Sequence, residues 1–585
     1  MANYRTPGVY VKEVSTLPPS VAEVSTAVPA FIGYTSKCPT RDDTSDSITP
    51  VIRRISTLLD YIALFGGANP SEFDVTTRTN ADGVTQIAST TRDISNKHSL
   101  YYSLCFYFKN GGGSCYIVSV GNYTVLPTTT HFNDGLAALE KEDEPTLIVL
   151  TDAVALLGAV EYTALCVDAL AQCKKLGDRF AILDVGKAGP PKTDEEQLSD
   201  VGYFRNNTGT KDLIYGAAYY PFVETSLSFD YEESGVSIKS GGTIGDSNSS
   251  HNWQKTFGTN GILVTYYGPG GNTTGGGTPG VNVLQGETAD NSFDITSKIL
   301  TITLGTTTAT RKGDGIAQDW IDWKQNNGTV AEGFEIVANG TGNSKPPTTT
   351  EATELDIQST PQTESSDKKL SDLKSSNTAL YNQIKTALAQ QRITLPPSPA
   401  IAGVYASVDK DRGVWKAPAN ISLSSVIGPV TKISQEDQDQ LNVDENGKSI
   451  NAIRAFTGKG TLVWGARTLA GNDNEWRYVS VRRLFNMIEE STQKATSFAV
   501  FEPNDATTWL KVKAMIESYL YGLWQQGALA GLTPEDAYFV EVGLGKTMRT
   551  EDILEGRMIV NIGVAAVRPA EFIILTFMHK LQQAA

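Results

Sequence analysis

The chain has 585 residues, with 65 acidic against 49 basic side chains and a net charge of -16. This balance argues against a nucleic-acid binder, whose binding surface is basic, and against adsorption to anionic lipid. Hydrophobic residues make up 40% and charged residues 19%, so the chain can bury sizeable cores, and its length predicts several domains.

The first 30 residues are predicted to form an extended arm. Val9 and Val11 alternate with Tyr10 and Lys12, and the prolines at 18 and 19 end the pattern. Pro7 and Gly8 interrupt any apolar core of signal-peptide length, so Sec export is not expected. A strand so close to a terminus has little sequence beside it, so its partner is expected far away in the chain or in another chain.

Regular elements follow from residue 146. Residues 146–150 and 180–185 read as short apolar strands, and residues 161–176 between them as an amphipathic helix, which together predict a βαβ unit. Asp152 and Asp184 lie at the carboxyl ends of the two strands, at the edge where open α/β sheets bind ligands. Without a glycine-rich loop beside them, capping and turn roles are favoured over a metal or nucleotide site.

Composition changes after residue 221. Residues 222–394 contain the glycine-rich stretch 268–280, short threonine-rich alternations and a Pro/Thr/Ser/Glu run, followed by a predicted helix at about 371–390. Frequent turn signals between brief strands predict an added β-rich domain. This stretch is acidic, and it is expected to be exposed and peripheral.

The last third of the chain is nearly neutral. Residues 391–585 carry a net charge of -1, so almost all of the -16 lies before them. Residues 482–494 and a longer segment after Asp505 are predicted amphipathic helices. Residues 558–567 and 572–577 read as apolar strands.

Catalytic motifs are poorly supported. Residues 543–547 (GLGKT) resemble the end of a phosphate-binding loop, but Val540 stands where the first glycine is required. There is no HExxH, GxSxG or CxxC motif, and the five cysteines indicate buried thiols rather than a disulfide framework. No catalytic residue, cofactor or metal site is therefore predicted.

A series of motifs in chain order resembles the tail sheath proteins of contractile phage tails and phage-tail-like injection systems. The series opens with YRTPGVYVKE at residues 4–13 and VPAFIG at 28–33, and it is densest in the C-terminal third. Further matching segments are residues 50–67, 100–118, 180–185, 215–221, 401–420, 451–456, 460–469, 476–484, 501–505, 527–540 and 556–572.

The resemblance implies a multi-domain α/β (α+β) fold with extended terminal arms. Shorter family members lack a counterpart of the segment between residues 221 and 395, which supports an insertion there. The expected organisation is an inter-subunit arm (1–30), an α/β sheath domain (31–221), an inserted β-rich outer domain (222–394), an inner sheath domain (395–567) and a C-terminal arm (568–585).

The resemblance also implies a function. Sheath subunits stack as hexameric rings around an inner tube and contract to drive it through a target envelope. The implied partners are further copies of the chain, the inner tube, baseplate and terminal cap proteins, and sister sheath proteins where these exist; nucleic acid and membrane insertion are not expected. Assembly is expected in the bacterial cytoplasm, as part of a phage tail or tail-like particle.

Two groups of residues are candidates for these contacts. The terminal arms are expected to complete a small sheet in neighbouring subunits, and four basic residues on the two C-terminal helices are candidates for facing the tube, with solvated or intra-sheath roles weighed equally. The arm residues are Val9, Tyr10, Val11, Val14, Phe572, Ile573, Ile574 and Leu575, and the tube-facing candidates are Arg482, Arg483, Lys511 and Lys513.

Two other functions stay open at this point. One is an enzyme that uses Asp152 and Asp184 to hold a metal or nucleotide. The other is a static lattice or surface protein whose Gly/Thr-rich domain recognises glycans; such a lattice would have a single length, whereas a contractile sheath has two states.

Overall fold

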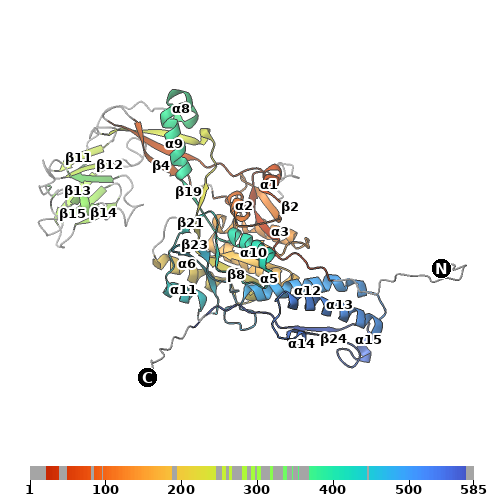
Figure 1. The fold of residues 1–585 in the computed structure, drawn as a ribbon. Coiled ribbons are helices and arrows are strands. Elements are labelled where there is room, and N and C mark those ends of the chain that lie inside the picture. Colours follow the sequence, from red (N-terminus) through yellow and green to blue (C-terminus); the bar gives the residue numbers. More distant parts are fainter. Residues whose placement is uncertain are drawn as a thin grey trace, which may run out of the picture. The chain divides into compact units, whose positions relative to one another are not determined.

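The computed structural model describes most of the chain between residues 21 and 574. The described residues are 21–37, 49–80, 85–94, 97–186, 194–244, 253–257, 262–266, 280–285, 291–296, 299–304, 312, 316–320, 334–338, 346, 353–354, 368–444, 447–572 and 574. They form two compact units (Figure 1). Unit 1 contains residues 1–70, 94–230 and 389–585, and unit 2 contains residues 71–93 and 231–388.

Unit 1 is built on a nine-stranded sheet in the order β2-β5-β1-β6-β7-β8-β22-β23-β20. The strands from β5 to β22 run parallel, and antiparallel strands close both ends. Every residue of β1 is buried, as expected for a parallel strand covered on both faces. The strands are β1 Pro29–Thr35, β2 Val51–Ile55, β5 Cys115–Asn122, β6 Leu147–Val149, β7 Phe180–Asp184, β8 Gly216–Tyr220, β20 Ile421–Ser422, β22 Ile450–Phe456 and β23 Gly460–Val463.

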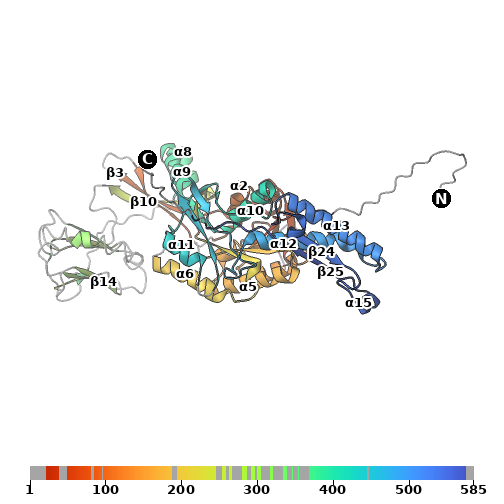
Figure 2. The ribbon, with the colours of Figure 1, turned by 60° about the horizontal axis from the view of Figure 1, so that its bottom comes forward.

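Helices cover both faces of this sheet (Figure 2). One hydrophobic core packs α3, α5 and α6 on one face, and a second packs α1, α2 and α10 on the other. A small sheet of β9 (Val223–Ser228), β19 (Arg392–Leu395) and β21 (Val426–Pro429) lies beside them. The helices are α1 Leu58–Phe65, α2 Leu100–Lys109, α3 Thr129–Leu139, α4 Ala153–Leu156, α5 Ala159–Leu176, α6 Asp194–Asn207, α10 Ser398–Arg412 and α11 Gln435–Asn442.

The C-terminal part of unit 1 is a separate helical layer over a two-stranded sheet. α12 (Val479–Thr496) and α13 (Ala506–Gln525) lie side by side and share a hydrophobic core with β24 (Tyr538–Val542) and β25 (Val560–Val564) (Figure 1). α13 begins at Asp505, whose Oδ1 accepts the amide of Thr508 at 2.9 Å. Two short helices, α14 (Pro534–Ala537) and α15 (Thr550–Leu554), complete this part.

Unit 2 contains a mixed sheet and a β-sandwich. The mixed sheet has the order β18-β10-β3-β4, and α8 and α9 belong to the same unit. In the sandwich, the sheets β11-β12-β16 and β14-β15-β13-β17 share a core with Trp320 fully buried. The elements are β3 Phe73–Asn80, β4 Thr85–Arg92, β10 Val236–Ile244, β11 Trp253–Phe257, β12 Ile262–Tyr266, β13 Gly280–Gln285, β14 Ser292–Thr296, β15 Ile299–Leu304, β16 Phe334–Ala338, β17 Thr353–Glu354, β18 Lys368–Lys369, α8 Leu370–Ser376 and α9 Thr378–Gln390.

Two domain boundaries differ from those expected from the sequence. Unit 2 starts at residue 231 rather than 222, and it also takes residues 71–93 from the expected α/β domain, because β3 pairs in parallel with β10. The expected inner domain, 395–567, is not separate from the N-terminal part either, because β22 extends the nine-stranded sheet through parallel pairing with β8. The mixed α/β fold and the predicted βαβ unit, β6-α5-β7, are confirmed.

Candidate functional site

The two-stranded sheet of β24 and β25 is the candidate interface. The strands pair antiparallel with Val540 opposite Ile562, and within the described residues no third strand joins them. Val540 is buried in the core with α12 and α13, and Val560 and Val564 pack partly against the same core. One face of the sheet is therefore covered by helices while its outer edges are available.

The free edge of β25 presents backbone groups at alternate residues. The amide of Ala565 donates to the carbonyl of Ala537 at 2.8 Å, in continuation of the pairing with β24. Because antiparallel strands direct successive residues to opposite sides, Val560, Ile562 and Val564 direct their N–H and C=O groups away from β24. An extended segment can add to these groups as a further strand.

An apolar groove of about 880 Å³ lies along this edge. Its walls come from α12, the turn after it, α13 and the start of β25, and the side chains of Val560, Ile562 and Val564 line it. A strand added to β25 would direct every second side chain toward this groove. The helical wall is made of Phe485, Ile488, Glu489, Thr492, Gln493, Thr496, Val512 and Ile516.

Phe501 stands at the rim of the groove. Its ring is fully exposed and its φ of 67° is left-handed, which is costly for an aromatic residue. Strained backbone of this kind is concentrated at functional positions. An exposed phenylalanine held in such a conformation beside an apolar groove is suited to contact an incoming segment.

The root of the N-terminal arm, residues 21–28, is fixed to α10 and α12. The guanidinium of Arg483 donates to the carbonyl of Thr26 at 2.7 Å and pairs with both carboxylate oxygens of Asp409, at 3.0 and 2.5 Å. The hydroxyl of Thr26 donates to Asp409 at 2.6 Å, and the amide of Val24 donates to the hydroxyl of Ser491. The N-terminal arm therefore leaves the body at a fixed point.

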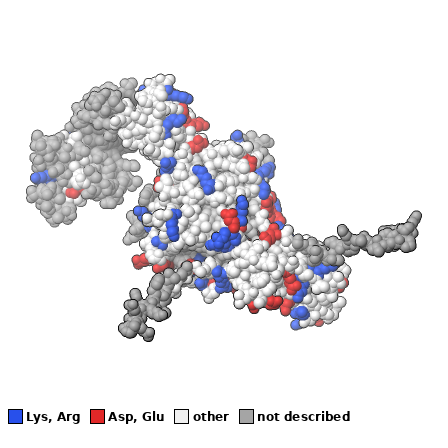
Figure 3. Space-filling view, in the orientation of Figure 1, with Lys and Arg blue, Asp and Glu red and all other residues white. Residues whose placement is uncertain are grey.

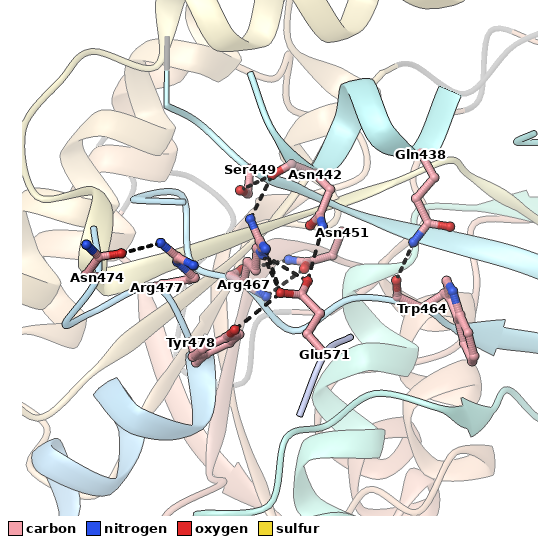
Figure 4. A network of polar contacts seen from close by, with 10 residues as sticks. All are labelled: Gln438, Asn442, Ser449, Asn451, Trp464, Arg467, Asn474, Arg477, Tyr478 and Glu571. Carbon is pink, nitrogen blue, oxygen red and sulfur yellow. Dashed lines mark hydrogen bonds and ion pairs between the residues drawn. The ribbon is translucent and has the colours of Figure 1, made fainter. Parts of the chain in front are cut away.

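The root of the C-terminal arm, residues 568–572, is fixed at Glu571 (Figure 4). Arg467 donates to its carboxylate through Nε at 2.9 Å and Nη2 at 2.5 Å, and Asn442 and Tyr478 donate to it at 3.1 and 3.2 Å. These donors hold the pKa of Glu571 below its usual value, against the desolvation that would raise it.

The expected arm strands lie mostly outside the described residues. Val9, Tyr10, Val11, Val14, Ile573 and Leu575 cannot be placed for this reason. Phe572 and Ile574 are described, are not in a strand and are strongly exposed, at 72% and 88%.

Two of the four tube-facing candidates are interior residues. Arg482 and Arg483 are each only 3% exposed. Arg482 pairs with Glu489 at 3.0 Å and lies over the ring of Trp476. Arg483 donates to the carbonyl of Thr26 in the root of the N-terminal arm. This burial argues against tube-facing roles for these two candidates, because both charges are already paired within the subunit.

The other two candidates remain on the surface of α13. Lys511 is exposed, and Lys513 is partly exposed and forms an ion pair with Glu517, one turn away, at 3.4 Å. Figure 3 shows basic and acidic side chains intermixed over the visible face of unit 1 rather than gathered into one basic patch.

Asp152 and Asp184 have structural partners. Asp152 accepts the amides of Tyr34 and Ser99, at 2.9 and 2.8 Å. Asp184 accepts the amide and the hydroxyl of Ser398, at 2.8 and 2.6 Å, and its burial raises its pKa to about 7. Both carboxyl groups are fully buried and bond to protein groups, which suits a role in joining segments of the fold.

The described part of the chain contains neither a metal-binding cluster nor a membrane-spanning helix. No group of three or more His, Cys, Asp or Glu side chains there could hold a metal ion. No helix there is long and apolar enough to cross a membrane.

The C-terminal part of the chain matches a known family. Residues 471–579, which contain α12, α13, β24 and β25, match the phage tail sheath C-terminal domain. The chain is 24% identical over 185 residues to the tail sheath proteins of Vibrio phage KVP40 and Enterobacteria phage T4. These alignments cover 32% of the chain and only about a quarter of each phage protein, 26% and 27%.

Solved structures match over the whole chain. The helical sheath of the anti-feeding prophage in its contracted state is 27% identical, with a TM-score of 0.53 and coverage of 99% of this chain and 100% of that one. The sheath complex of the PVC extracellular contractile injection system, also contracted, is 27% identical with a TM-score of 0.51 and full coverage of both chains. These relatives are structural sheath proteins, not enzymes, and the resemblance found in the sequence is confirmed.

Sequence reasoning missed the residues that fix the two arm roots and those that line the groove. Arg467 and Asp409 lie within matching motifs, but their partners Glu571 and Thr26 are distant in sequence, at separations of 104 and 383 residues. The alternation at Val560, Ile562 and Val564 is visible in the sequence, whereas the open edge beside it depends on the fold.

Proposed function

We propose that the chain, which matches the phage tail sheath C-terminal domain and solved contractile sheaths, is the repeating subunit of a contractile sheath. The subunits stack as hexameric rings around an inner tube, and contraction drives this tube through a target envelope. The observation that carries the proposal is the open edge of β25, which runs along an apolar groove in a chain whose two arm roots are fixed to the body of unit 1.

Neighbouring subunits are joined by strand addition. The N-terminal arm of one copy, with Val9 and Val11 on one face, supplies a segment whose alternating apolar side chains suit the groove. The C-terminal arm, with Phe572 and Ile574 already exposed, supplies a second segment. Main-chain hydrogen bonds hold such a joint whatever the neighbouring side chains do, so the link survives movement of the subunit bodies.

Contraction follows from this arrangement. The subunit bodies rotate and slide between two packings while the added strands act as hinged tethers. The work comes from the difference in contact free energy between the two states, multiplied over the array. Nucleotide hydrolysis has no part in the proposal.

Contact with the inner tube is assigned to α13. Lys511 and Lys513 are the surface candidates for weak charge pairing that can be released on contraction. Solved relatives include a subunit in the baseplate of the anti-feeding prophage, which supports a baseplate as a further partner.

The particle is a phage tail or a tail-like injection device assembled in bacterial cytoplasm. Unit 2, which carries much of the acidic insertion, is assigned to the outer surface.

Deletion of residues 2–14 tests the central step. The deleted chain is expected to stay folded and monomeric, with unchanged circular dichroism, and to form no sheaths in electron micrographs. A finer variant, Val9→Asp with Val11→Asp, should have the same effect, whereas Lys12→Glu on the opposite face of the arm should assemble. Sheaths of normal length from the deleted chain would refute strand addition by this arm.

A further inference from the structure

We infer that Arg467 and Glu571 form a latch that sets where the C-terminal arm begins. The latch consists of Arg467, Glu571, Asn442 and Tyr478, and its assignment rests on the proposed function of the arm. Arg467 and Glu571 are positioning residues: they determine the point from which the arm reaches a neighbouring subunit.

The socket for Glu571 is assembled from the body of unit 1. Asn451 in β22 accepts the amide of Arg467 at 2.7 Å and donates to its carbonyl at 2.8 Å, which fixes the backbone of Arg467 against the central sheet. Nη1 of Arg467 donates to the carbonyl of Asn442, the last residue of α11, at 3.1 Å. Ser449 donates to that same carbonyl at 2.6 Å, so the guanidinium is held in one orientation.

Glu571 completes this socket from outside. Figure 4 shows its carboxylate pointing between Arg467, Asn442 and Tyr478, which come from three different segments of the body. The side chain of Arg467 is 4% exposed and that of Glu571 is 23% exposed. Removal of the carboxylate leaves a nearly buried guanidinium without its charged partner, which is strongly unfavourable.

The position of the latch in the chain determines how long the free C-terminal arm is. Before it, the amide of Val567 donates to the carbonyl of Ala528 and the guanidinium of Arg568 donates to the carbonyl of Asn474. After it comes Phe572, which is 72% exposed. With the latch closed the arm begins at residue 572. With it open, and Arg568 still held, the arm gains residues 569–571, or roughly 10 Å of reach at about 3.5 Å per residue.

Such a gain in length weakens the joint between subunits. A longer and more loosely attached tether lowers the effective concentration of its strand at the neighbouring groove and lets the strand meet more than one register. The N-terminal root is more deeply buried, since Arg483 and Asp409 have side chains only 3% and 7% exposed. Of the two roots, the C-terminal one is thus the one open to release.

The experiment compares Glu571→Ala with Glu144→Ala in the full chain. Glu144 is a matched control, because it also accepts from an arginine and a tyrosine, Arg54 at 3.2 Å and Tyr116 at 2.6 Å, but it does not contact the C-terminal root. The first readout is the rate of chymotrypsin cleavage after Phe572 in the unassembled subunit. The second is the yield and length of sheaths in electron micrographs.

Glu571→Ala is expected to speed cleavage about tenfold or more, because proteolysis follows the population of the open form. It should also lower the yield of full-length sheaths, while Glu144→Ala changes neither readout. Glu571→Gln, which keeps an acceptor for Arg467, should fall between Ala and the wild type. Normal cleavage, normal sheaths, or equal effects from the control would each overturn the latch.

Deletion of residues 572–585 separates this proposal from the proposed function. If the deletion abolishes assembly and Glu571→Ala does not impair it, the arm is needed and the latch is refuted. If the deleted chain assembles normally, the proposed role of the C-terminal arm has failed, and the latch has no assembly role either.

Discussion

Arg483 in α12 and Asp409 in α10 form a buried ion pair, with Nη2 and Oδ2 2.5 Å apart and side chains 3% and 7% exposed. The same carboxylate accepts the hydroxyl of Thr26, and the same guanidinium donates to the carbonyl of Thr26. One pair therefore joins the α/β body, the C-terminal helical layer and the start of the N-terminal arm.

Asp409→Ala should destabilise unit 1 by about 3–5 kcal/mol, because it leaves the Arg483 charge buried and unpaired. Denaturant unfolding of the purified chain measures this loss. Asp409→Asn keeps an acceptor and should lose less. A loss below about 1 kcal/mol for the alanine variant would show that the pair is not the buried contact described here.

Much of the α/β body could be predicted from the sequence, and the reason is burial. Strands covered on both faces need continuous apolar runs, so β6 and β7 were visible as such, and the helix between them shows the period of an amphipathic helix. The pairing of β3 with β10 was not visible, because both strands are rich in Thr and Ser and lie far apart in the chain.

The interior arginines were not foreseen for a related reason. Charged residues on a helix are usually solvated, so Arg482 and Arg483 read as surface groups. α12 is instead enclosed on most sides, and buried residues run along it from Val479 to Thr492. Partners that include Trp476, Glu489 and Asp409 make the burial of these charges tolerable.

Asp184 should make stability depend on pH. Its pKa is raised from 3.8 to about 7 because burial disfavours the charged carboxylate. The folded state therefore binds this proton more tightly than the unfolded state does, so its contribution to stability is complete below about pH 4 and is lost as the pH rises to about 7.

Asp184→Asn removes this titration and can still bond to both groups of Ser398. The melting temperature of the variant minus that of the wild type should thus rise between pH 4 and pH 7 and level off above. The difference isolates Asp184 from other groups that titrate in this range. A difference that is flat with pH, or that falls, contradicts the raised pKa.

Replacement of Phe501 should leave the subunit equally or more stable and should impair sheath assembly. Its φ of 67° costs roughly 1–2 kcal/mol for a non-glycine residue, and its exposed ring gains almost nothing within the subunit. Phe501→Gly should leave the free energy of unfolding unchanged or raise it by up to about 1 kcal/mol. It should also lower the yield of sheaths, because the rim of the groove loses its aromatic side chain.

Phe501→Asn is the control for backbone strain, because asparagine tolerates the left-handed conformation while also lacking the ring. Both variants should impair assembly similarly, measured by sedimentation of polymer. If both assemble like the wild type, the exposed ring makes no contact with an incoming segment.

Ile562 allows the open edge of β25 to be tested by removing one hydrogen atom from the backbone. In the alternation of the pair, Ile562 directs its N–H away from β24, so Ile562→Pro deletes a donor at the outer edge and keeps the hydrogen bonds between β24 and β25. The subunit should stay folded, with a loss limited to the smaller side chain, while sheath formation fails. Ile562→Ala also loses the side chain but keeps the N–H, and it should assemble with reduced yield.

The N–H of Asn561 points toward β24 instead. Asn561→Pro should therefore disrupt the sheet itself, seen as loss of the folded C-terminal part. Sheaths of normal yield and length from Ile562→Pro would show that no strand adds to β25.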